Sequence, residues 1–562
     1  MESQTDGNES SSHSWAICGS CLGRIRRFIP VDFKKEMVEL SKLAVPVFMA
    51  QVMSFLMGFV STVFCGHLGK TELAGVALAT AVINVTGLSI GFGLSSTCDT
   101  LISQTFGSGN LLKVGVILQR TMLIVLLACF PCWSILINTE SILLAVKQSP
   151  EVARVAQLYV KIFMPALPAA FMYQIQCKYL QNQGIIWPEV IIGAVGNILN
   201  AIINYVCLFA LNLGVAGSAA ANTISQFSMA ALLYSYIMWR GLHKATWGGW
   251  SKDCLQEWGA FIKLAIPSML MLCVEWWTYE IGGFLAGLIS EVELDAQSII
   301  LEVSSIAYLF PLGYSIAGSV RVGNALGAGN TEQAKLSAKL AVFCAGSVSV
   351  FLTIIIGSTK NIISYMFSND EEIRARVADV MTFYTPFLIL EALTCASGGI
   401  IRGAGKQKVG AGVYIAGYYG IGLPVGVSLM FAAKLGILGL WIGFFTCACL
   451  QSSILLFYLY KINWKTVTKE AQVRAGIKVN HQDLGSDGSM VGQPEQVGPY
   501  QINRDTTSLT ESDNELAVTV AGGMLSHKAL VLRRGLTLAG MLSFLAAGII
   551  TNLLISNFIH GA

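Results

Sequence analysis

The sequence predicts an all-α integral membrane protein, and three observations carry that prediction. The chain has 562 residues, of which 54% are hydrophobic and only 12% are charged. Its mean hydropathy of +0.62 exceeds that of ordinary soluble domains. Apolar runs of about 20 residues, each long enough to cross about 30 Å of hydrocarbon as a helix, recur along nearly the whole chain. We therefore expect a bundle of membrane-spanning helices.

Thirteen apolar runs predict thirteen spans. Their approximate ranges are 40–63, 72–97, 112–137, 153–175, 186–212, 216–239, 258–289, 294–320, 336–358, 377–400, 409–434, 438–461 and 534–558. The residues before the first run are polar and then basic, so we expect no cleavable signal peptide and a cytosolic N-terminus. With thirteen spans, the C-terminus then lies outside the cell.

The distribution of Lys and Arg agrees with that orientation. Segments predicted to face the cytosol hold most of the basic residues, among them Arg120, Lys178 and Arg402, as the positive-inside rule requires. The net charge of +3 reflects this asymmetry and predicts no nucleic-acid partner.

An internal repeat organises the chain. Aligning Pro46 with Pro267 brings Gly66 onto Gly287, and the same spacing of 221 residues later aligns Gly184 with Gly405. Because each copy has six spans, the two copies enter the membrane in the same direction, as a parallel repeat about an axis near the membrane normal. We expect them to form an N-lobe and a C-lobe around a central cleft.

The predicted domains follow from the repeat and from composition. They are, in order, a cytosolic tail at 1–39, the N-lobe at 40–240, a cytosolic loop at 241–257, the C-lobe at 258–461, a disordered, polar cytosolic linker at 462–533, a thirteenth helix at 534–558 and an extracellular C-terminus at 559–562. The repeated segments 40–240 and 258–461 are called the first half and the second half below.

Carboxylates at membrane depth are the strongest candidates for a functional site. They are Glu275 and Glu280 in the seventh span, Glu302 in the eighth and Glu391 in the tenth. Their repeat partners in the first half carry no charge, and no Lys or Arg lies in the middle of those three spans. Such carboxylates are expensive in a bilayer and mark functional sites by default. Desolvation and like-charge proximity disfavour their ionisation, so they hold protons or recruit a cation.

Helix geometry separates the two acids of the seventh span. At about 100° per residue, Glu275 and Glu280 point about 140° apart. We expect one to face the central cleft and the other the interior of the second half, and the sequence leaves open which is which. The alternative for any single glutamate is a carboxyl group hydrogen-bonded to a neighbouring helix.

Aromatic and polar residues accompany the acids. Trp276, Tyr279 and Tyr308 are candidates to line a wall for an organic cation through attraction to their ring faces, although such clusters also serve packing. In the first half, Gln51 and Asn84 are candidates for the opposite wall, with an interhelical hydrogen bond as the alternative.

Other charged residues and the close pair of cysteines are not candidates for the functional site. Asp99 is interpreted as a solvated or capping carboxylate near a helix end, and Glu291 with Asp295 as a solvated rim. The pair Cys18 and Cys21 lacks the second pair or the histidines that a zinc site needs. No nucleotide-binding, metalloprotease or kinase motif is present, so we expect no enzyme activity, no metal and no cofactor besides protons as the coupling ion.

The chain resembles the multidrug and toxin extrusion family over residues 40–461. The motifs that carry the resemblance are VSTVFCGHLGKTELAG, GLSSTCDTLISQTFGSGN, KYLQNQG, VEWWTYEIGGFL, LFPLGYSIAGSVRVGNALGAGN and SGGIIRGAGKQKVGA. The thirteenth span after a long linker is similar to the vertebrate branch. Many bacterial members of the family have an aspartate in the first helix where this sequence has Ser61, which argues against a proton site in the first half.

The resemblance implies an exporter of organic cations that takes up external protons in exchange. It implies that Glu275, Glu280, Glu302 and Glu391 handle substrate and protons, and that Trp276, Tyr279, Tyr308, Gln51 and Asn84 line the substrate. It also implies a plasma-membrane location, apical in polarised cells. Partners are small organic cations, protons and membrane lipids, while substrate range and oligomeric state stay open.

Three other functions compete with export by alternating access. A flippase for phosphate-bearing lipids would carry basic groups in its cleft, where this sequence carries acids. If the chain were a receptor or scaffold, it would not transport the cation itself. Replacing Glu275 by Gln would then leave pH-gradient-driven cation uptake unchanged. A channel is disfavoured because duplicated halves with a one-sided acid cluster predict rocking of one half against the other.

Overall fold

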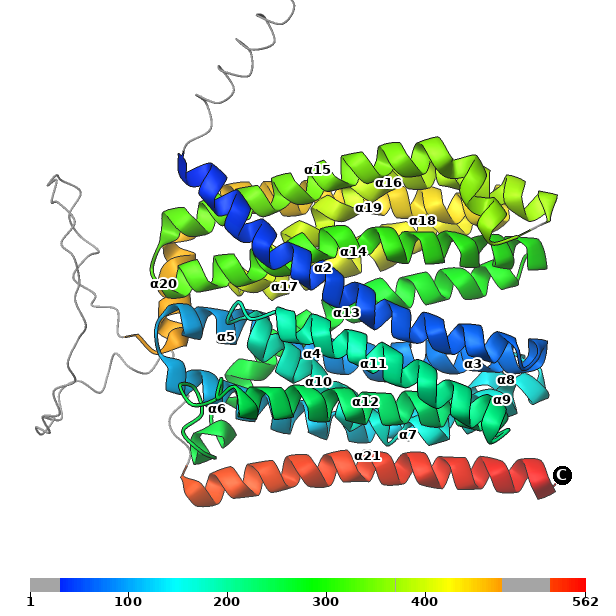
Figure 1. Ribbon diagram of the computed structural model, residues 1–562, viewed down its shortest axis with the longest axis horizontal. Coiled ribbons are helices and arrows are strands. Elements are labelled where there is room, and N and C mark those ends of the chain that lie inside the picture. The colour runs from blue at the N-terminus through cyan, green and yellow to red at the C-terminus, as the bar shows by residue number, and fades with distance from the viewer. Residues whose placement is uncertain (1–30, 369, 478–525, 562) are drawn as a thin grey trace, which may run out of the picture.

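The computed structural model describes residues 31–368, 370–477 and 526–561, and in these ranges every regular element is a helix. The helices lie side by side in a bundle, with the first half below the second in Figure 1. The first half contains α2 (Val31–Gly66), α3 (Lys70–Ile83), η1 (Asn84–Leu88), α4 (Ser89–Ser95), α5 (Cys98–Gly107), α6 (Leu111–Leu127), α7 (Cys129–Leu136), α8 (Thr139–Ala145), α9 (Pro150–Phe163), α10 (Ala166–Gln181), α11 (Trp187–Tyr205), η2 (Val206–Ala210) and α12 (Gly214–Trp239).

The second half and the helices after it complete the bundle. They are η3 (Lys252–Leu255) in the connecting loop, α13 (Trp258–Gly287), α14 (Glu291–Gly327), α15 (Thr331–Ile363), η4 (Ser364–Met366), α16 (Glu371–Ala404), α17 (Gln407–Ile415), η5 (Ala416–Gly422), α18 (Leu423–Val427), η6 (Ser428–Ala432), α19 (Ile437–Lys461), α20 (Trp464–Ala475) and α21 (His527–Gly561). The end of the bundle that carries α20 and the start of α2 is called the α20 end, and the opposite end the far end (Figure 1).

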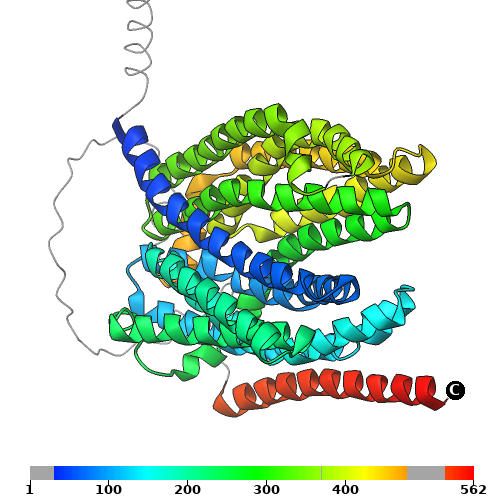
Figure 2. The same ribbon diagram turned by 45° about the vertical axis from the view of Figure 1, so that its right-hand side comes forward.

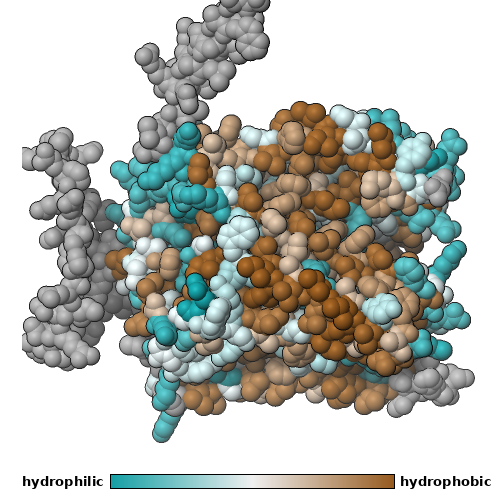
Figure 3. All heavy atoms as spheres, viewed as in Figure 1, coloured by the Kyte–Doolittle hydropathy of each residue, from teal (hydrophilic) through white to brown (hydrophobic). Residues whose placement is uncertain are grey.

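The membrane character of the chain is confirmed. Eleven described helices are long and apolar enough to span a bilayer, or twelve if α9 and α10, which bend by 57°, count as one span. Helix α12 is not among them because it carries many small and polar residues, of which Ser218 and Ser225 are buried. The count of thirteen therefore stays a prediction. Hydrophobic side chains cover the middle of the face in Figure 3, and hydrophilic ones gather at both ends.

Backbone conformation repeats with the sequence. Gly109 and Gly329, at the ends of the aligned FGSGN and LGAGN motifs, both have φ of 79°, and Gly184 and Gly405 have φ of 79° and 75°. These values lie in the left-handed region that glycine adopts without steric cost. The repeated glycines therefore end corresponding helices with the same turn in each half.

The two halves contact each other reciprocally near the α20 end. A Cβ atom on Gly107 would lie 2.1 Å from the backbone oxygen of Asn324, and one on Gly327 would lie 1.9 Å from the backbone oxygen of Gln104. In each case a glycine of one half meets the backbone of the other half at the matching repeat position. Such reciprocal contacts are expected when two similar units are related by an approximate two-fold axis.

The contact surface between the halves, called the seam, is closed at the α20 end. Thr100 Oγ1 donates a hydrogen bond to the backbone oxygen of Arg402 over 2.6 Å. Nearer the middle of the bundle, Trp277 Nε1 donates to the backbone oxygen of Val85 over 2.9 Å. Among the described residues, no side-chain hydrogen bond joins the halves between that level and the far end. The direct bonds between the halves therefore stabilise the α20 end.

Helix α2, the first of the first half, lies along the seam (Figures 1 and 2). Its early part packs on the second half, where a Cβ on Gly313 would lie 2.8 Å from the backbone oxygen of Ala44. Its later part is held by the first half, where Asn197 Nδ2 donates to the backbone oxygen of Met53 over 2.7 Å. Helix α2 thus passes from one half to the other.

Helix α13, the repeat counterpart of α2, makes the corresponding contacts. A Cβ on Gly93 of α4 would lie 2.6 Å from Met269 Cα, and one on Gly410 of α17 would lie 2.6 Å from Met271 Sδ. One neighbour belongs to the first half and the other to the second. Both seam helices therefore contact both halves.

The predicted linker at 462–533 is wrong at its beginning, because α20 forms there. Asn463 caps the helix by accepting a hydrogen bond from the backbone, and Gly476 ends it with φ of 92°. Val467 and Ala471 are buried one turn apart, so a short apolar stripe docks the helix on the bundle. The pair Cys18 and Cys21 and most of the linker lie outside the described residues.

Helix α21 begins before the predicted start at 534, at His527, and packs along α7 of the first half. Asn138 Nδ2 donates to the backbone oxygen of Gly548 over 3.0 Å, and a Cβ on Gly548 would lie 2.1 Å from Ser134 Oγ. In Figures 1 and 2 the helix lies beside the first half, and near its start the guanidinium of Arg534 lies 4.1 Å from the ring centroid of Trp258, the first residue of α13. Most of this helix therefore packs against the first half.

Candidate functional site

The first buried carboxylate of the second half is Glu275 on α13. Its side chain is buried and accepts a hydrogen bond from Tyr308 Oη of α14 over 3.1 Å. Tyr308 is itself part-buried. Glu275 therefore lies in the interior of the second half, between α13 and α14.

The second buried carboxylate is Glu391 on α16. Tyr279 Oη of α13 donates to Glu391 Oε1 over 2.7 Å, and the other oxygen, Oε2, has no hydrogen-bond partner among the described residues. Because Tyr279 lies one turn after Glu275 on the same face of α13, this tyrosine lies between the two acids. Glu275 and Glu391 also interact electrostatically. The structure thus joins both acids and both predicted tyrosines into one cluster.

Two further tyrosines of this cluster were missed. Tyr414 on α17 and Tyr418 on η5 are buried and interact electrostatically with Glu275. Their spacing of four residues places them on one helix face, and η5 is a π-helical stretch of seven residues, a feature frequent at functional sites. The three tyrosines in VYIAGYYG, of which Tyr414 and Tyr418 belong to the cluster, were the available signal, but nothing in the sequence links them to the seventh span.

Glu280 and Glu302 lie apart from the cluster. Glu280 is exposed and Glu302 is half-buried, and neither has a side-chain hydrogen bond to a described residue. Helices α13 and α14 are antiparallel and Glu275 meets Tyr308, so Glu280 is level with Glu302, about 8 Å nearer the far end. Glu275 therefore lies in the interior of the second half and Glu280 is exposed, and the expectation that one of the two acids faces the central cleft stays a prediction.

The remaining predicted residues lie near the seam. Trp276 meets Phe92 of the first half edge to face, with ring centroids 6.4 Å apart. Asn84 is the first residue of η1, next to the backbone group that Trp277 binds. Gln51 is half-buried on α2. These side chains lie on the elements that border the acid cluster, and none of them contacts Glu275 or Glu391 directly by a hydrogen bond.

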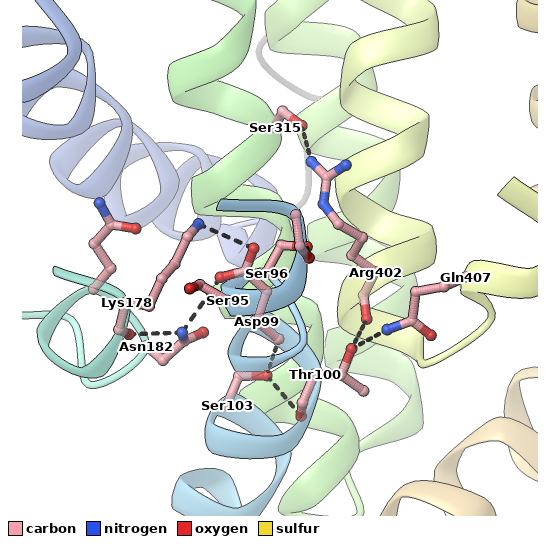
Figure 4. A network of polar contacts seen from close by, with 12 residues as sticks. Ser95, Ser96, Asp99, Thr100, Ser103, Lys178, Asn182, Ser315, Arg402 and Gln407 are labelled. Carbon is pink, nitrogen blue, oxygen red and sulfur yellow. Dashed lines mark hydrogen bonds and ion pairs between the residues drawn. The ribbon is translucent and has the colours of Figure 1, made fainter. Parts of the chain in front are cut away.

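Asp99 is not a solvated carboxylate, which corrects the interpretation given above. It is buried and accepts hydrogen bonds from Lys178 Nζ over 3.0 Å and from Asn182 Nδ2 over 3.4 Å (Figure 4). Lys178 is buried as well, although the sequence placed it in a cytosolic segment. A buried charge is retained only when it is paired, and the ion pair joins α5 to α10 inside the first half.

Arg402 corrects the expectation that the acids have no basic neighbour. It lies near the end of α16, and its guanidinium donates to Ser315 Oγ over 3.4 Å (Figure 4). It interacts electrostatically with Glu275 of the second half and with Asp99 of the first. The sequence did not reveal this because Arg402 follows Glu391 by about three helical turns.

This arrangement suits reversible binding of a proton or a cation. Glu391 Oε2 has no hydrogen-bond partner among the described residues, and the hydroxyl bound to Oε1 belongs to an aromatic side chain, whose ring face attracts an organic cation. Within the described ranges, no three His, Cys, Asp or Glu side chains are grouped as metal ligands would be.

A duplicated helical bundle with a carboxylate cluster in one copy is typical of secondary transporters. The MatE family model matches residues 46–206 and 267–428, one match in each half, beginning at the two aligned prolines. The chain therefore belongs to the MatE family of multidrug and toxin extrusion transporters, and it is a multi-pass membrane protein.

Individual relatives agree over nearly the full length. The chain is 60% identical to multidrug and toxin extrusion protein 1 of Danio rerio over 565 residues, covering 98% of this chain and 96% of the relative. It is 50% identical to the human protein of the same name over 532 residues, covering 92% of this chain and 93% of the relative. The crystal structure of the eukaryotic MATE transporter AtDTX14 superposes with a TM-score of 0.76 at 29% identity, covering 79% of this chain and 99% of that one. These matches confirm the family expected from the sequence and identify a transporter.

Proposed function

We propose that this transporter is a secondary active antiporter that exports organic cations from the cytosol in exchange for external protons. The α20 end faces the cytosol, because the basic residues gather there as the positive-inside rule requires. The membrane is the plasma membrane, and the names of the relatives, multidrug and toxin extrusion proteins, support export of varied compounds.

The observation that carries the proposal is the pair of buried carboxylates in the second half. Glu275 and Glu391 each receive one tyrosine hydroxyl, and Glu391 Oε2 has no described partner. A buried carboxylate without a full set of donors is stable when it is protonated or when it meets a cation. Either ligand satisfies the same group, so the proton and the substrate compete for it.

Glu280 receives the substrate first. It is exposed, it lies about 8 Å nearer the far end than the buried pair, and it is level with Glu302. An organic cation attracted to Glu280 and to the aromatic ring of Trp276 then lies next to the Tyr279 hydroxyl that bonds Glu391. Proton transfer stays with the buried pair, because of the four candidate glutamates only Glu275 and Glu391 are buried.

Alternating access moves the bound cation across the membrane. The seam is bonded at the α20 end, so this conformation is closed to the cytosol and presents the acids towards the outside. An external proton displaces the cation, and the protonated carrier rocks to open the α20 end. One monovalent cation exchanged for one proton moves no net charge, so the pH gradient drives the exchange and the membrane potential does not.

The test is uptake of tetraethylammonium by vesicles with a pH difference across the membrane. Trans-stimulated, saturable uptake is expected for the parent, and at least a tenfold loss for Glu391→Gln. Glu291→Gln is the matched control, because Glu291 is an exposed acid in the first turn of α14 and its removal leaves uptake unchanged. Uptake by Glu391→Gln at the parent rate, or flux that responds to voltage at zero pH difference, would refute the proposal.

A further inference from the structure

Two glutamates occupy matching repeat positions at the beginning of the seam helices. Glu36 lies in the first turns of α2, and Glu257 immediately precedes α13. They are separated by the same 221 residues that separate Pro46 from Pro267. Each forms an ion pair with an arginine at the α20 end, and the two arginines belong to different halves.

Glu36 is bound by the second half. Its side chain is buried, and it accepts hydrogen bonds from Arg321 Nε over 2.9 Å and Ser337 Oγ over 2.6 Å, together with bonds from Arg321 Nη2 and Gln333 Nε2. The donors lie on α14 and α15. The beginning of α2, the first helix of the first half, is therefore bound to the second half.

Glu257 is bound by the first half. Arg120 Nη1 of α6 donates to Glu257 Oε2 over 3.2 Å, and its Nη2 donates to the backbone oxygen of Asp253 over 3.0 Å. Helix α6 follows the FGSGN motif as α15 follows LGAGN, so α6, which carries Arg120, is the repeat counterpart of α15. Helix α15 is one of the two helices that bind Glu36. Glu257 also has φ of 55°, a strained value for a residue other than glycine, which persists only where contacts hold it.

The two contacts have the same geometric consequence. In each, the start of a seam helix bonds to one half while the remainder of that helix also contacts the other half. Moving the halves apart at the α20 end stretches both ion pairs. We infer that Glu36 and Glu257 are a repeated pair of latches that keep the α20 end closed and release when that end opens. This inference rests on the alternating access of the proposed function.

The latches differ in strength. The Glu36 carboxylate accepts four hydrogen bonds and its side chain is 4% exposed. The Glu257 side chain is 59% exposed and bonds to Arg120 alone, whose side chain is 7% exposed. Water can replace Arg120 at the exposed Glu257 carboxylate, whereas opening leaves the buried Glu36 carboxylate without its four donors, which is more unfavourable. The Glu257 latch therefore opens first, and the Glu36 latch sets the frequency with which the α20 end opens.

Accessibility of a seam residue measures latch opening without any substrate. Ser103 is fully buried and faces Gly323 of the other half, so Ser103→Cys reacts with a maleimide only when the halves part. The full chain carrying Ser103→Cys is labelled in inside-out vesicles, and the modified fraction at position 103 is followed by mass spectrometry, which separates it from native cysteines.

The expected result is at least a tenfold faster labelling with Glu36→Gln and about a two- to threefold faster labelling with Glu257→Gln. The two effects multiply in the double variant, because the latches are separate. Glu332→Gln is the matched control, since Glu332 pairs with Lys335 of the same helix over 2.6 Å and its removal leaves the rate unchanged.

Labelling of both latch variants at the parent rate would overturn the inference. If Glu36→Gln does not reach the membrane, the exposed Glu257→Gln decides alone, because an exposed side chain tolerates this change. Labelling requires neither a cation nor a pH gradient. If the latch variants are labelled faster but the parent shows no proton-driven uptake, the latches are supported and the proposed antiport is contradicted. If the parent shows proton-driven uptake but the latch variants are labelled at the parent rate, only the latches are contradicted.

Discussion

Substitution of Gly327 by alanine tests whether the seam closes as the structure describes. The new Cβ would lie 1.9 Å from the backbone oxygen of Gln104 and 2.7 Å from its carbonyl carbon. Favourable contacts need about 3.5 Å, so α14 and α5 must move apart by roughly 1.5 Å. The obstacle is backbone, so no side-chain rotation relieves it.

The magnitude follows from what that movement breaks. The Gln104 side chain donates to the backbone oxygen of Gly403 over 2.8 Å, and Thr100 donates to that of Arg402 over 2.6 Å. An added 1.5 Å removes both bonds, each with a net contribution of about 1 kcal/mol, and overpacking alone costs about 1 to 3 kcal/mol. We expect the closed α20 end to lose about 3 to 5 kcal/mol, which is roughly a 150- to 5,000-fold shift towards the open form.

The assay is the rate at which Ser103→Cys reacts with a maleimide added to the α20 side. Gly107→Ala should match Gly327→Ala, because the two glycines make reciprocal contacts, with 2.1 Å and 1.9 Å to the opposing backbone. Gly259→Ala is the control, since no atom lies within 4 Å of its Cβ position. Parent-like labelling in both seam variants, with the protein fully in the membrane, would refute the reasoning.

Further predictions concern the ion pair, the acid cluster and the last helix. Lys178→Met leaves Asp99 buried without its cation and should lower stability by about 3 to 5 kcal/mol, whereas adding Asp99→Asn should restore most of it; thermal aggregation of purified protein reports both. Tyr279→Phe removes the 2.7 Å hydrogen bond to Glu391 and should lower the maximal rate of proton-driven uptake several-fold while its half-saturation concentration changes less, and an unchanged maximal rate would contradict the cluster. Gly548→Leu should detach α21 from α7 because its Cβ position is occupied, with faster proteolysis of that helix as the readout and resistance to proteolysis as the contrary result.

The repeat was the most informative feature of the sequence for the fold. Pro46 and Pro267 fixed the register, and Gly184 with Gly405 supplied matching helix ends, because chain reversals depend on local backbone geometry that glycine alone tolerates. Helix α20 was not predictable in the same way. It is polar overall, and its docking depends on two buried residues, Val467 and Ala471, whose contact surface is made by distant segments.

The sequence predicted which residues belong to the site, but not which of them lie close together. Charged residues at membrane depth pointed to Glu275 and Glu391, because a carboxylate in the bilayer is energetically costly and usually marks a functional site. The 140° separation of Glu275 and Glu280 predicted different surroundings, but only packing shows that Glu280 is the exposed one. The pairing of Asp99 with Lys178 joins residues 79 positions apart, and nothing local to either residue signals the partner.

Exchange measured in both directions tests the central claim most directly. Vesicles containing the purified chain and a pH-sensitive dye are given tetraethylammonium on one side, with the membrane potential clamped at zero. We predict that protons move oppositely to the cation, one for one, and that Glu391→Gln abolishes both fluxes while Glu291→Gln preserves them. Cation movement without a matching proton flux, or proton-coupled exchange that survives in Glu391→Gln, would contradict the account.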